Sequence, residues 1–189
     1  MTRPTIRAVA AAFVAAGLLL ATPAAAELRF ALDADYTVPT NDGLRSAGHG
    51  PHFGARLGWA FDLAPAELVL EARGSSLNFP SDLAEEKDGW AGFGAQGGLR
   101  VGVDLLGWRT ALFAHGGYGE TEVNGSDYVE LHNGYLIDAG ASVTFTLLPL
   151  VGVGGQVAYN WLIEEEHSNT ALERTAEWIS FGVHLELRI

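Results

Sequence analysis

Hydrophobic and polar residues alternate with a period of two in eight segments of this chain, namely 28–36, 52–62, 68–73, 93–105, 108–118, 135–147, 151–161 and 179–189. In the first segment, Leu28, Phe30 and Leu32 share one face, whereas Arg29 and Asp33 share the other. This period is typical of β-strands with one apolar face. Most segments have about ten residues or more, the length of a tilted strand that crosses a bilayer. Segment 68–73 predicts a shorter strand.

The connections between these segments alternate in length. Tight links near 64–66, 106–107 and 148–149 join the second segment to the third, the fourth to the fifth and the sixth to the seventh. The other connections are polar loops of more than a dozen residues each, and short turns at one end with long loops at the other are typical of outer-membrane barrels. The short turns and both chain termini of the barrel domain are then expected to face the periplasm.

An even number of such segments predicts an all-β fold, an eight-stranded antiparallel up-and-down barrel, but alternation does not say which face is inside. A soluble barrel, the alternative, would turn its apolar face inward. Here that face carries Trp59, Trp108 and Trp161, and such side chains are too bulky for an eight-stranded interior. The polar face places glycines such as Gly98 and Gly154 between its charges, which suits a crowded interior. We therefore expect a transmembrane barrel whose apolar face contacts lipid.

Charged and aromatic positions support this orientation. The polar face holds a balanced set of charges that can pair inside a barrel, because an unpaired buried charge costs several kcal/mol: Arg29, Arg56, Arg73, Arg100, Arg109, Arg188, Asp33, Asp35, Glu71, Asp104, Asp138 and Glu186. We predict that ion pairs among them hold the barrel shut, notably those of Arg56, Arg73, Arg100, Glu71, Asp104 and Asp138. Two aromatic belts are also expected, with Tyr36, Tyr118, Tyr135, Tyr159 and Trp161 near the loops and Trp59, Phe61, Trp108 and Phe145 near the turns.

The first 26 residues predict a signal peptide. Arg3 and Arg7 give a positive start, an apolar run covers 8–21, and the segment closes on small residues at 24–26. The alternative, a membrane anchor, is disfavoured because a spanning helix needs about 18–20 apolar residues. Residues 27–189 are then one barrel domain, exported to the outer membrane. The chain has no cysteine, so disulfides are excluded, and its net charge of −12 makes nucleic acid an unsuitable partner.

The predicted architecture resembles the small outer-membrane barrels of the OmpA-transmembrane-domain and OmpX type. The resemblance covers the whole mature chain and is one of architecture, without a diagnostic motif. Segment 179–189 resembles the C-terminal β-signal that the barrel assembly machinery recognises, although it ends in Ile189 where the family usually has an aromatic residue. The resemblance implies a monomer that contacts outer-membrane lipid and lipopolysaccharide and needs no cofactor.

The predicted loops hold most of the remaining acids. Candidate cation ligands are Glu120, Glu122, Asp127, Glu164, Glu165 and Glu166. Hard divalent cations need several oxygens, which clustered carboxylates offer, and a basic surface partner would fit the same charges. The simpler interpretation, which we favour, is a solvated and repulsive surface. No other metal site and no catalytic residue is predicted.

Three classes of function remain open for such a barrel. We favour a non-enzymatic protein that serves envelope structure or surface interaction. A narrow or gated pore is the first alternative, although charged side chains would fill an eight-stranded lumen. A lipid-modifying enzyme is the second: deacylases of the PagL type use a lipid-facing His/Ser pair, whereas His52, His115 and His184 fall on the charged face here.

Overall fold

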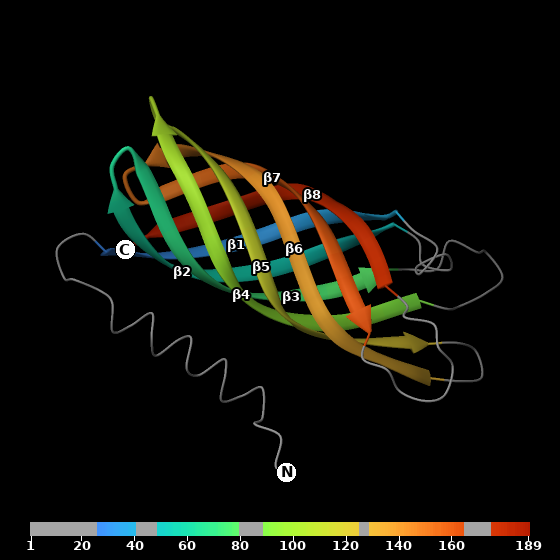
Figure 1. The fold of residues 1–189 in the computed structure, drawn as a ribbon. Coiled ribbons are helices and arrows are strands. Elements are labelled where there is room, and N and C mark those ends of the chain that lie inside the picture. Colours follow the sequence, from blue (N-terminus) through green and yellow to red (C-terminus); the bar gives the residue numbers. More distant parts are fainter. Residues whose placement is uncertain (1–25, 41–48, 80–88, 125–128, 165–174) are drawn as a thin grey trace, which may run out of the picture.

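Eight antiparallel strands form a closed barrel in the computed structural model, which describes residues 26–40, 49–79, 89–124, 129–164 and 175–189 (Figure 1). The strands are β1 (Ala26–Pro39), β2 (Gly50–Leu63), β3 (Ala66–Phe79), β4 (Gly89–Leu105), β5 (Trp108–Asn124), β6 (Val129–Leu148), β7 (Val151–Glu164) and β8 (Thr175–Arg188). Each strand pairs with its neighbours in sequence, and β1 pairs with β8 to close the sheet. The described part of the chain holds no helix long and apolar enough to cross a membrane.

The two ends of the barrel differ, as the lengths of the connections predict. We call turn end the end that carries the links at 64–65, 106–107 and 149–150, and loop end the opposite one, where β1, β3, β5 and β7 finish. At the turn end, the backbone N–H of Leu28 donates to the carbonyl of Ile189 at 3.0 Å. The two ends of the barrel sequence therefore meet there. The predicted signal peptide lies outside the described residues, apart from Ala26 at the start of β1, and stays a prediction.

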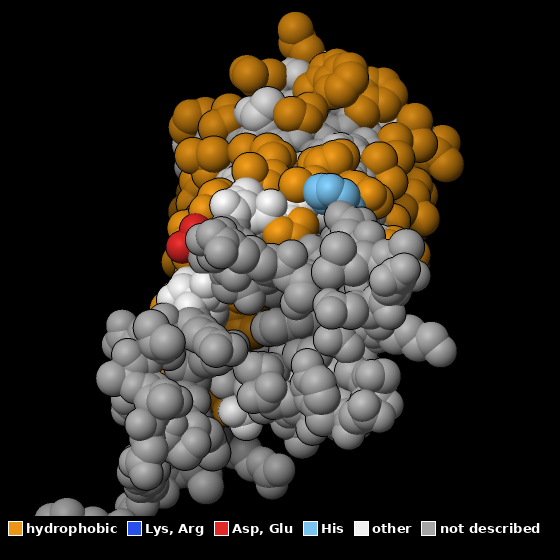
Figure 2. Space-filling view, turned by 90° about the vertical axis from the view of Figure 1, so that its right-hand side faces the viewer, with side chains coloured by type: hydrophobic (Ala, Val, Ile, Leu, Met, Phe, Trp, Pro, Cys, Tyr) orange, Lys and Arg blue, Asp and Glu red, His pale blue; other side chains and the backbone are white. Residues whose placement is uncertain are grey.

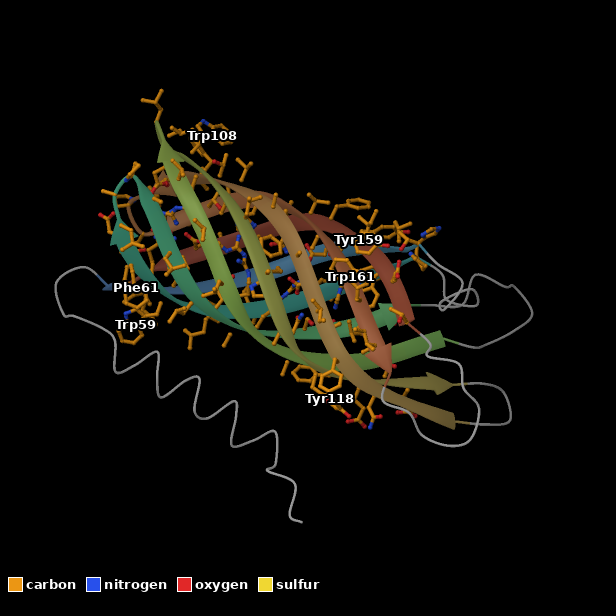
Figure 3. The ribbon with its side chains drawn as sticks, viewed as in Figure 1. Trp59, Phe61, Trp108, Tyr118, Tyr159 and Trp161 are labelled. Carbon is orange, nitrogen blue, oxygen red and sulfur yellow. The ribbon has the colours of Figure 1, made fainter. Side chains whose placement is uncertain are left out.

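The predicted faces are confirmed. Large apolar side chains point outward, such as Phe53 and Leu112, which are 60% and 70% exposed, whereas Arg56 and Asp138 point inward and are buried. Hydrophobic side chains cover most of the described wall seen in Figure 2. Figure 3 shows Trp59, Phe61 and Trp108 toward one end, and Tyr118, Tyr159 and Trp161 toward the other. These positions match the two expected aromatic belts.

The prediction of a short third strand is wrong. The strand β3 spans Ala66–Phe79 and is as long as β1 and β2. Beyond Gly74 the hydrophobic pattern inverts, because Leu77 points inward and is 1% exposed, whereas Asn78 points outward. Ser76 and Asn78 on the outer surface are polar, as expected for a part of the strand that lies outside the apolar band.

The expected loop between the fifth and sixth strands is also largely absent. The strands β5 and β6 continue as a paired hairpin as far as Asn124 and Val129, so that residues 125–128 alone separate them. Glu120 and Glu122 therefore lie on the outward side of β5, where both are exposed. The polar composition of this segment predicted a loop, but an antiparallel ladder can equally carry polar side chains on a solvated outer face.

Candidate functional site: the barrel interior

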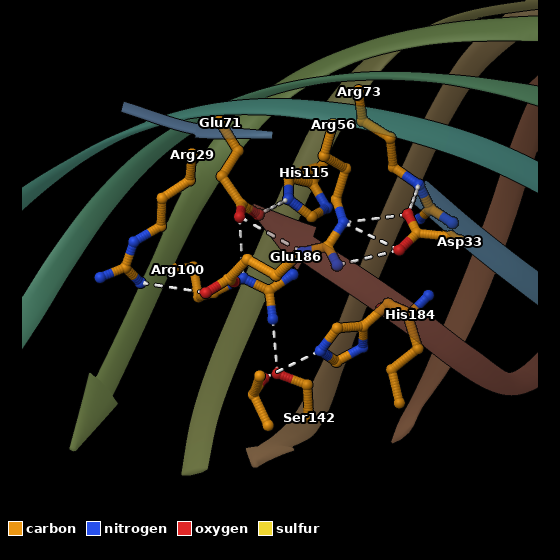
Figure 4. Close-up of polar contacts among 12 residues, drawn as sticks. Arg29, Asp33, Arg56, Glu71, Arg73, Arg100, His115, Ser142, His184 and Glu186 are labelled. Atoms are coloured by element: carbon orange, nitrogen blue, oxygen red, sulfur yellow. Dashed lines mark hydrogen bonds and ion pairs between the residues drawn. The ribbon is translucent and has the colours of Figure 1, made fainter. Parts of the chain in front are cut away.

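Inward side chains of all eight strands meet on the barrel axis, and many of them are charged. Strand alternation points every second side chain into the lumen. The absence of Cβ atoms at the inward Gly98 and Gly154 leaves room for the rings of His115 and His184. Figure 4 shows part of the resulting network of hydrogen bonds and ion pairs. Because the strands are staggered, partners far apart in sequence come together in layers along the axis.

The layer at the turn end is built around two arginines. Arg29 on β1 donates through both Nη atoms to the two carboxylate oxygens of Glu67 on β3. Arg109 on β5 lies 3.3 Å from Glu186 on β8 and 3.1 Å from Asp104 on β4. Arg109 also lies 3.4 Å from Glu67, so that this layer is one connected network. It links strands from opposite sides of the wall.

The middle layer surrounds Glu71. This carboxylate accepts hydrogen bonds from Arg100 at 2.9 Å and Arg56 at 3.3 Å, and it lies 2.9 Å from Nε2 of His115. Arg56 also forms a forked pair with Asp33, with Nε to Oδ2 and Nη2 to Oδ1 both at 2.9 Å. Forked arginine–carboxylate pairs are strong and directional, so they fix both side chains.

The next layer toward the loop end is centred on Arg73 and Asp138. Nη1 of Arg73 donates to Oδ2 of Asp138 at 3.1 Å, and Nη2 donates to Asp35 at 3.3 Å. Gln96 donates to Asp138 at 2.8 Å, and Gln156 donates to Asp35 at 2.9 Å. His115 connects this layer to the one below, because its Nδ1 lies 2.7 Å from Asp138.

The network ends at an apolar cluster near the loop end. We call it the apolar cap, and its members are Leu77, Leu136, Leu162, Ala176 and Trp178, each no more than 2% exposed. They come from β3, β6, β7 and β8 and all point inward. The lumen is therefore polar over most of its length and apolar at one end.

Most of the predicted interior charges are paired as expected, and the structure supplies the partners. Arg56, Arg73, Arg100, Glu71 and Asp138 all take part in buried pairs. Asp104 contacts Arg109 but lies at the mouth, where its side chain is 57% exposed. Two participants were missed: Glu67 and the partly exposed Glu27, which lies 3.1 Å from Arg29. The inward parity of Glu67, four positions before Glu71, was the signal that could have found it.

The described part of the structure does not bring the candidate cation ligands together. Glu120 and Glu122 lie on the outward side of β5. Asp127, Glu165 and Glu166 lie outside the described residues, and Glu164 ends β7 with its side chain outside the description. Among the residues described, no group of three or more His, Asp or Glu side chains could hold a metal ion.

Three histidines lie inside the wall, as predicted. His115 bridges Glu71 and Asp138, and Nε2 of His184 lies 2.8 Å from the hydroxyl of Thr144. His52 is buried, and neither of its ring nitrogens has a hydrogen-bond partner among the described residues. None of the three faces lipid. A His/Ser pair of the deacylase kind therefore does not form from them.

Known structures share this fold. A major outer membrane protein from Thermus thermophilus is 14% identical, with a TM-score of 0.53 over 87% of this chain and 99% of that chain. Neisserial surface protein A is 10% identical, with a TM-score of 0.51 over 87% and 97%. Ail, the attachment invasion locus protein of Yersinia pestis, is 11% identical, with a TM-score of 0.50 over 87% and 99%. No family model and no curated protein matches the sequence.

The fold and the arrangement of its faces define the class of protein. This chain folds as a small eight-stranded outer-membrane β-barrel, with an apolar outer wall and a polar interior. It is similar to the OmpA-transmembrane-domain and OmpX type at the level of architecture, and the low identities establish the shared fold alone.

Proposed function

We propose that the protein is a closed, non-enzymatic barrel of the outer membrane that serves envelope structure or surface interaction. The observation that carries this proposal is the set of ion pairs that cross the lumen. Arg73 on β3 meets Asp138 on β6, and Arg109 on β5 meets Glu186 on β8. An eight-stranded barrel has an interior just wide enough for side chains to fill, so such contacts block a solute path.

The apolar cap supports closure independently of the charges. A hydrated ion that passed the charged layers would next meet Leu136, Leu162 and Trp178, all buried and in mutual contact. Apolar constrictions oppose ion passage because they do not replace the hydration shell. The two barriers differ in chemistry, and removal of one leaves the other in place.

The interior also argues against an enzyme that holds an acyl chain in its barrel, because the described lumen is charged over most of its length.

Surface interaction is favoured by the exposed acids at the loop end, including Glu120 and Glu122. Divalent cations or a basic surface partner would suit these charges, whereas outer-membrane lipid and lipopolysaccharide would contact the apolar wall. The name of the similar Ail protein refers to attachment, which is consistent with a role at the surface. We further propose a monomer whose β8 strand is recognised by the assembly machinery.

Conductance across planar bilayers tests the closed state. We expect the refolded chain to give no steady channel, and we expect a variant with Arg73→Ala and Trp178→Ala together to give measurable current. A stable open channel from the unaltered chain would contradict the proposal and favour a pore. Release of fatty acids from lipopolysaccharide by the purified protein would contradict the non-enzymatic assignment.

A further inference from the structure

The turns at the turn end are unusually apolar. Leu63, Leu106, Leu148 and Leu150 are each at least 60% exposed, and Leu106 is fully exposed at the tip of its turn. Turn residues in water are more often Gly, Asn, Asp, Ser or Pro, whose side chains are polar or small. We call these residues, together with their neighbours, the leucine collar: Leu63, Leu105, Leu106, Leu147, Leu148 and Leu150.

Apart from Leu105, which pairs with Trp108, the leucine collar lies beyond the apolar band that the membrane requires. The strand β5 advances ten residues from Trp108 in one aromatic belt to Tyr118 in the other. At about 3.4 Å per residue and a tilt of about 40°, these residues cover about 25 Å, the height of the apolar band in outer-membrane barrels. Leu106 follows β4 on the far side of Trp108, so the collar extends the apolar surface past this band.

Leu106 also occupies a backbone conformation that disfavours leucine. The pair Leu105↔Trp108 encloses a two-residue turn in which Leu106 has φ 51° and Gly107 has φ 88°. Two consecutive positive φ angles define a turn that prefers Asn, Asp or Gly at its first position. A side chain with a Cβ atom is strained there. Leucine at this position therefore combines strain with exposure, which favours a contact that covers it.

The collar encircles the end of the barrel. Its members come from the β2–β3, β4–β5 and β6–β7 turns, and Ile189, 78% exposed, adds an apolar group after β8. The charged groups of this end, such as Asp104 and Arg109, lie toward the axis. The collar itself contains no charged residue. A protein that docked over this end would have to cover the charged mouth as well, whereas a lipid leaflet contacts a ring and leaves the mouth open.

We propose that the leucine collar is immersed in the lipid leaflet on the turn side, so that acyl chains and glycerol groups cover it. This proposal rests on the proposed function only in that the barrel lies in a membrane. It assigns to the turns a task beyond the connection of strands: they anchor the barrel at a fixed depth in that leaflet. The charged mouth, which lies inside the ring of the collar, stays in contact with water.

Single spin labels test the proposal cleanly, because the chain has no native cysteine. We would label Leu106→Cys and Leu148→Cys in the mature chain, refolded in vesicles of phosphatidylethanolamine and phosphatidylglycerol, and measure collisions with oxygen and with a water-soluble nickel chelate. Val101→Cys on the lipid-facing wall and Asp104→Cys at the mouth are the controls. We expect both collar labels to collide at least threefold more with oxygen than with the chelate, as the Val101 label does.

Collar labels that match the Asp104 label would overturn the proposal. If the Val101 label also met the chelate freely, the membrane barrel itself would be wrong, so the two failures can be told apart. Collar labels that are exposed in vesicles but protected in native membranes would likewise overturn it, in favour of a protein partner.

As a second test, Leu106→Asn should relieve strain and raise the unfolding midpoint in detergent, while it weakens insertion into vesicles at least twofold. A gain in both properties would contradict the proposal.

Discussion

Arg73 on β3 reaches across the barrel axis to Asp138 on β6, with 3.1 Å between Nη1 and Oδ2. The side chain of Asp138 has no exposed surface, and Gln96 and His115 also contact its carboxylate. One carboxylate thus holds together side chains from β3, β4 and β5. Its removal should affect the whole wall rather than a single pair of strands.

Asp138→Ala is expected to lower the free energy of unfolding by about 3–5 kcal/mol, because it leaves a buried guanidinium without one of its partners. Urea titration in lipid vesicles, followed by tryptophan fluorescence, measures the change. Asp104→Ala is the control: its side chain is 57% exposed, and exposed pairs contribute about 0–1 kcal/mol. Equal losses of unfolding free energy in the two variants would mean that the pair of Arg73 and Asp138 stabilises the barrel no more than an exposed pair does.

Leu136→Ala should lower the free energy of unfolding by about 2–5 kcal/mol, since Leu136 is 2% exposed inside the apolar cap and its truncation leaves a cavity. The same urea titration is used. Leu136→Met keeps most of the volume and should cost less than about 1.5 kcal/mol. If both variants unfolded like the parent chain, the cap would not be a packed cluster.

Gly98→Ala tests the close approach of β4 and β5. A Cβ atom at Gly98 would overlap the carbonyl oxygen of Ala114, so the strands would have to move apart. We expect a loss of about 1–3 kcal/mol and a lower yield of folded barrel. At Gly116, on β5, nothing lies within 4 Å of the added Cβ atom, and Gly116→Ala should fold normally. The folded fraction can be read from electrophoretic mobility without boiling.

The refolded mature chain should itself show heat-dependent mobility. A barrel closed by the pairing of β1 with β8 has no free sheet edge at which unfolding could begin, so it is expected to stay compact in detergent until it is boiled. Electrophoresis with and without boiling, together with far-ultraviolet circular dichroism, checks this. A β-rich chain that is soluble and monomeric without detergent would instead mean that the apolar face points into a soluble barrel.

Alternation along the strands predicted the fold well because each inward or outward position depends on local parity alone. The faces of Arg56, Phe53 and Leu112 followed from this rule. Parity also placed Phe113 among the charges, where the Arg100 guanidinium lies 4.6 Å from its ring centre. Beyond the apolar band the parity continues but the chemistry of the faces inverts: Leu77 and Trp178 point inward although they are hydrophobic, because the interior is the buried side where the outer surface is solvated.

The partners of the interior charges could not be predicted in the same way. Arg73 lies 3.1 Å from Asp138 and 3.8 Å from Asp33, and its pair with Asp138 depends on the stagger between β3 and β6, which are not neighbours in the sheet. That stagger accumulates over three strand registers, and each register depends on turn geometry that composition does not fix. Glu67 was not predicted to join the interior ion pairs because it lies next to a turn, where an acid is expected to be solvated.

The backbone bonds between Leu28 and Ile189, at 3.0 and 2.8 Å, make the wall a cycle in which no strand is geometrically first. A circularly permuted chain, with a short linker from Ile189 to Leu28 and new ends between β3 and β4, should close into the same cylinder. If cells nevertheless insert only the original order, the requirement for β8 at the C-terminal position belongs to biogenesis and not to the energetics of the finished barrel.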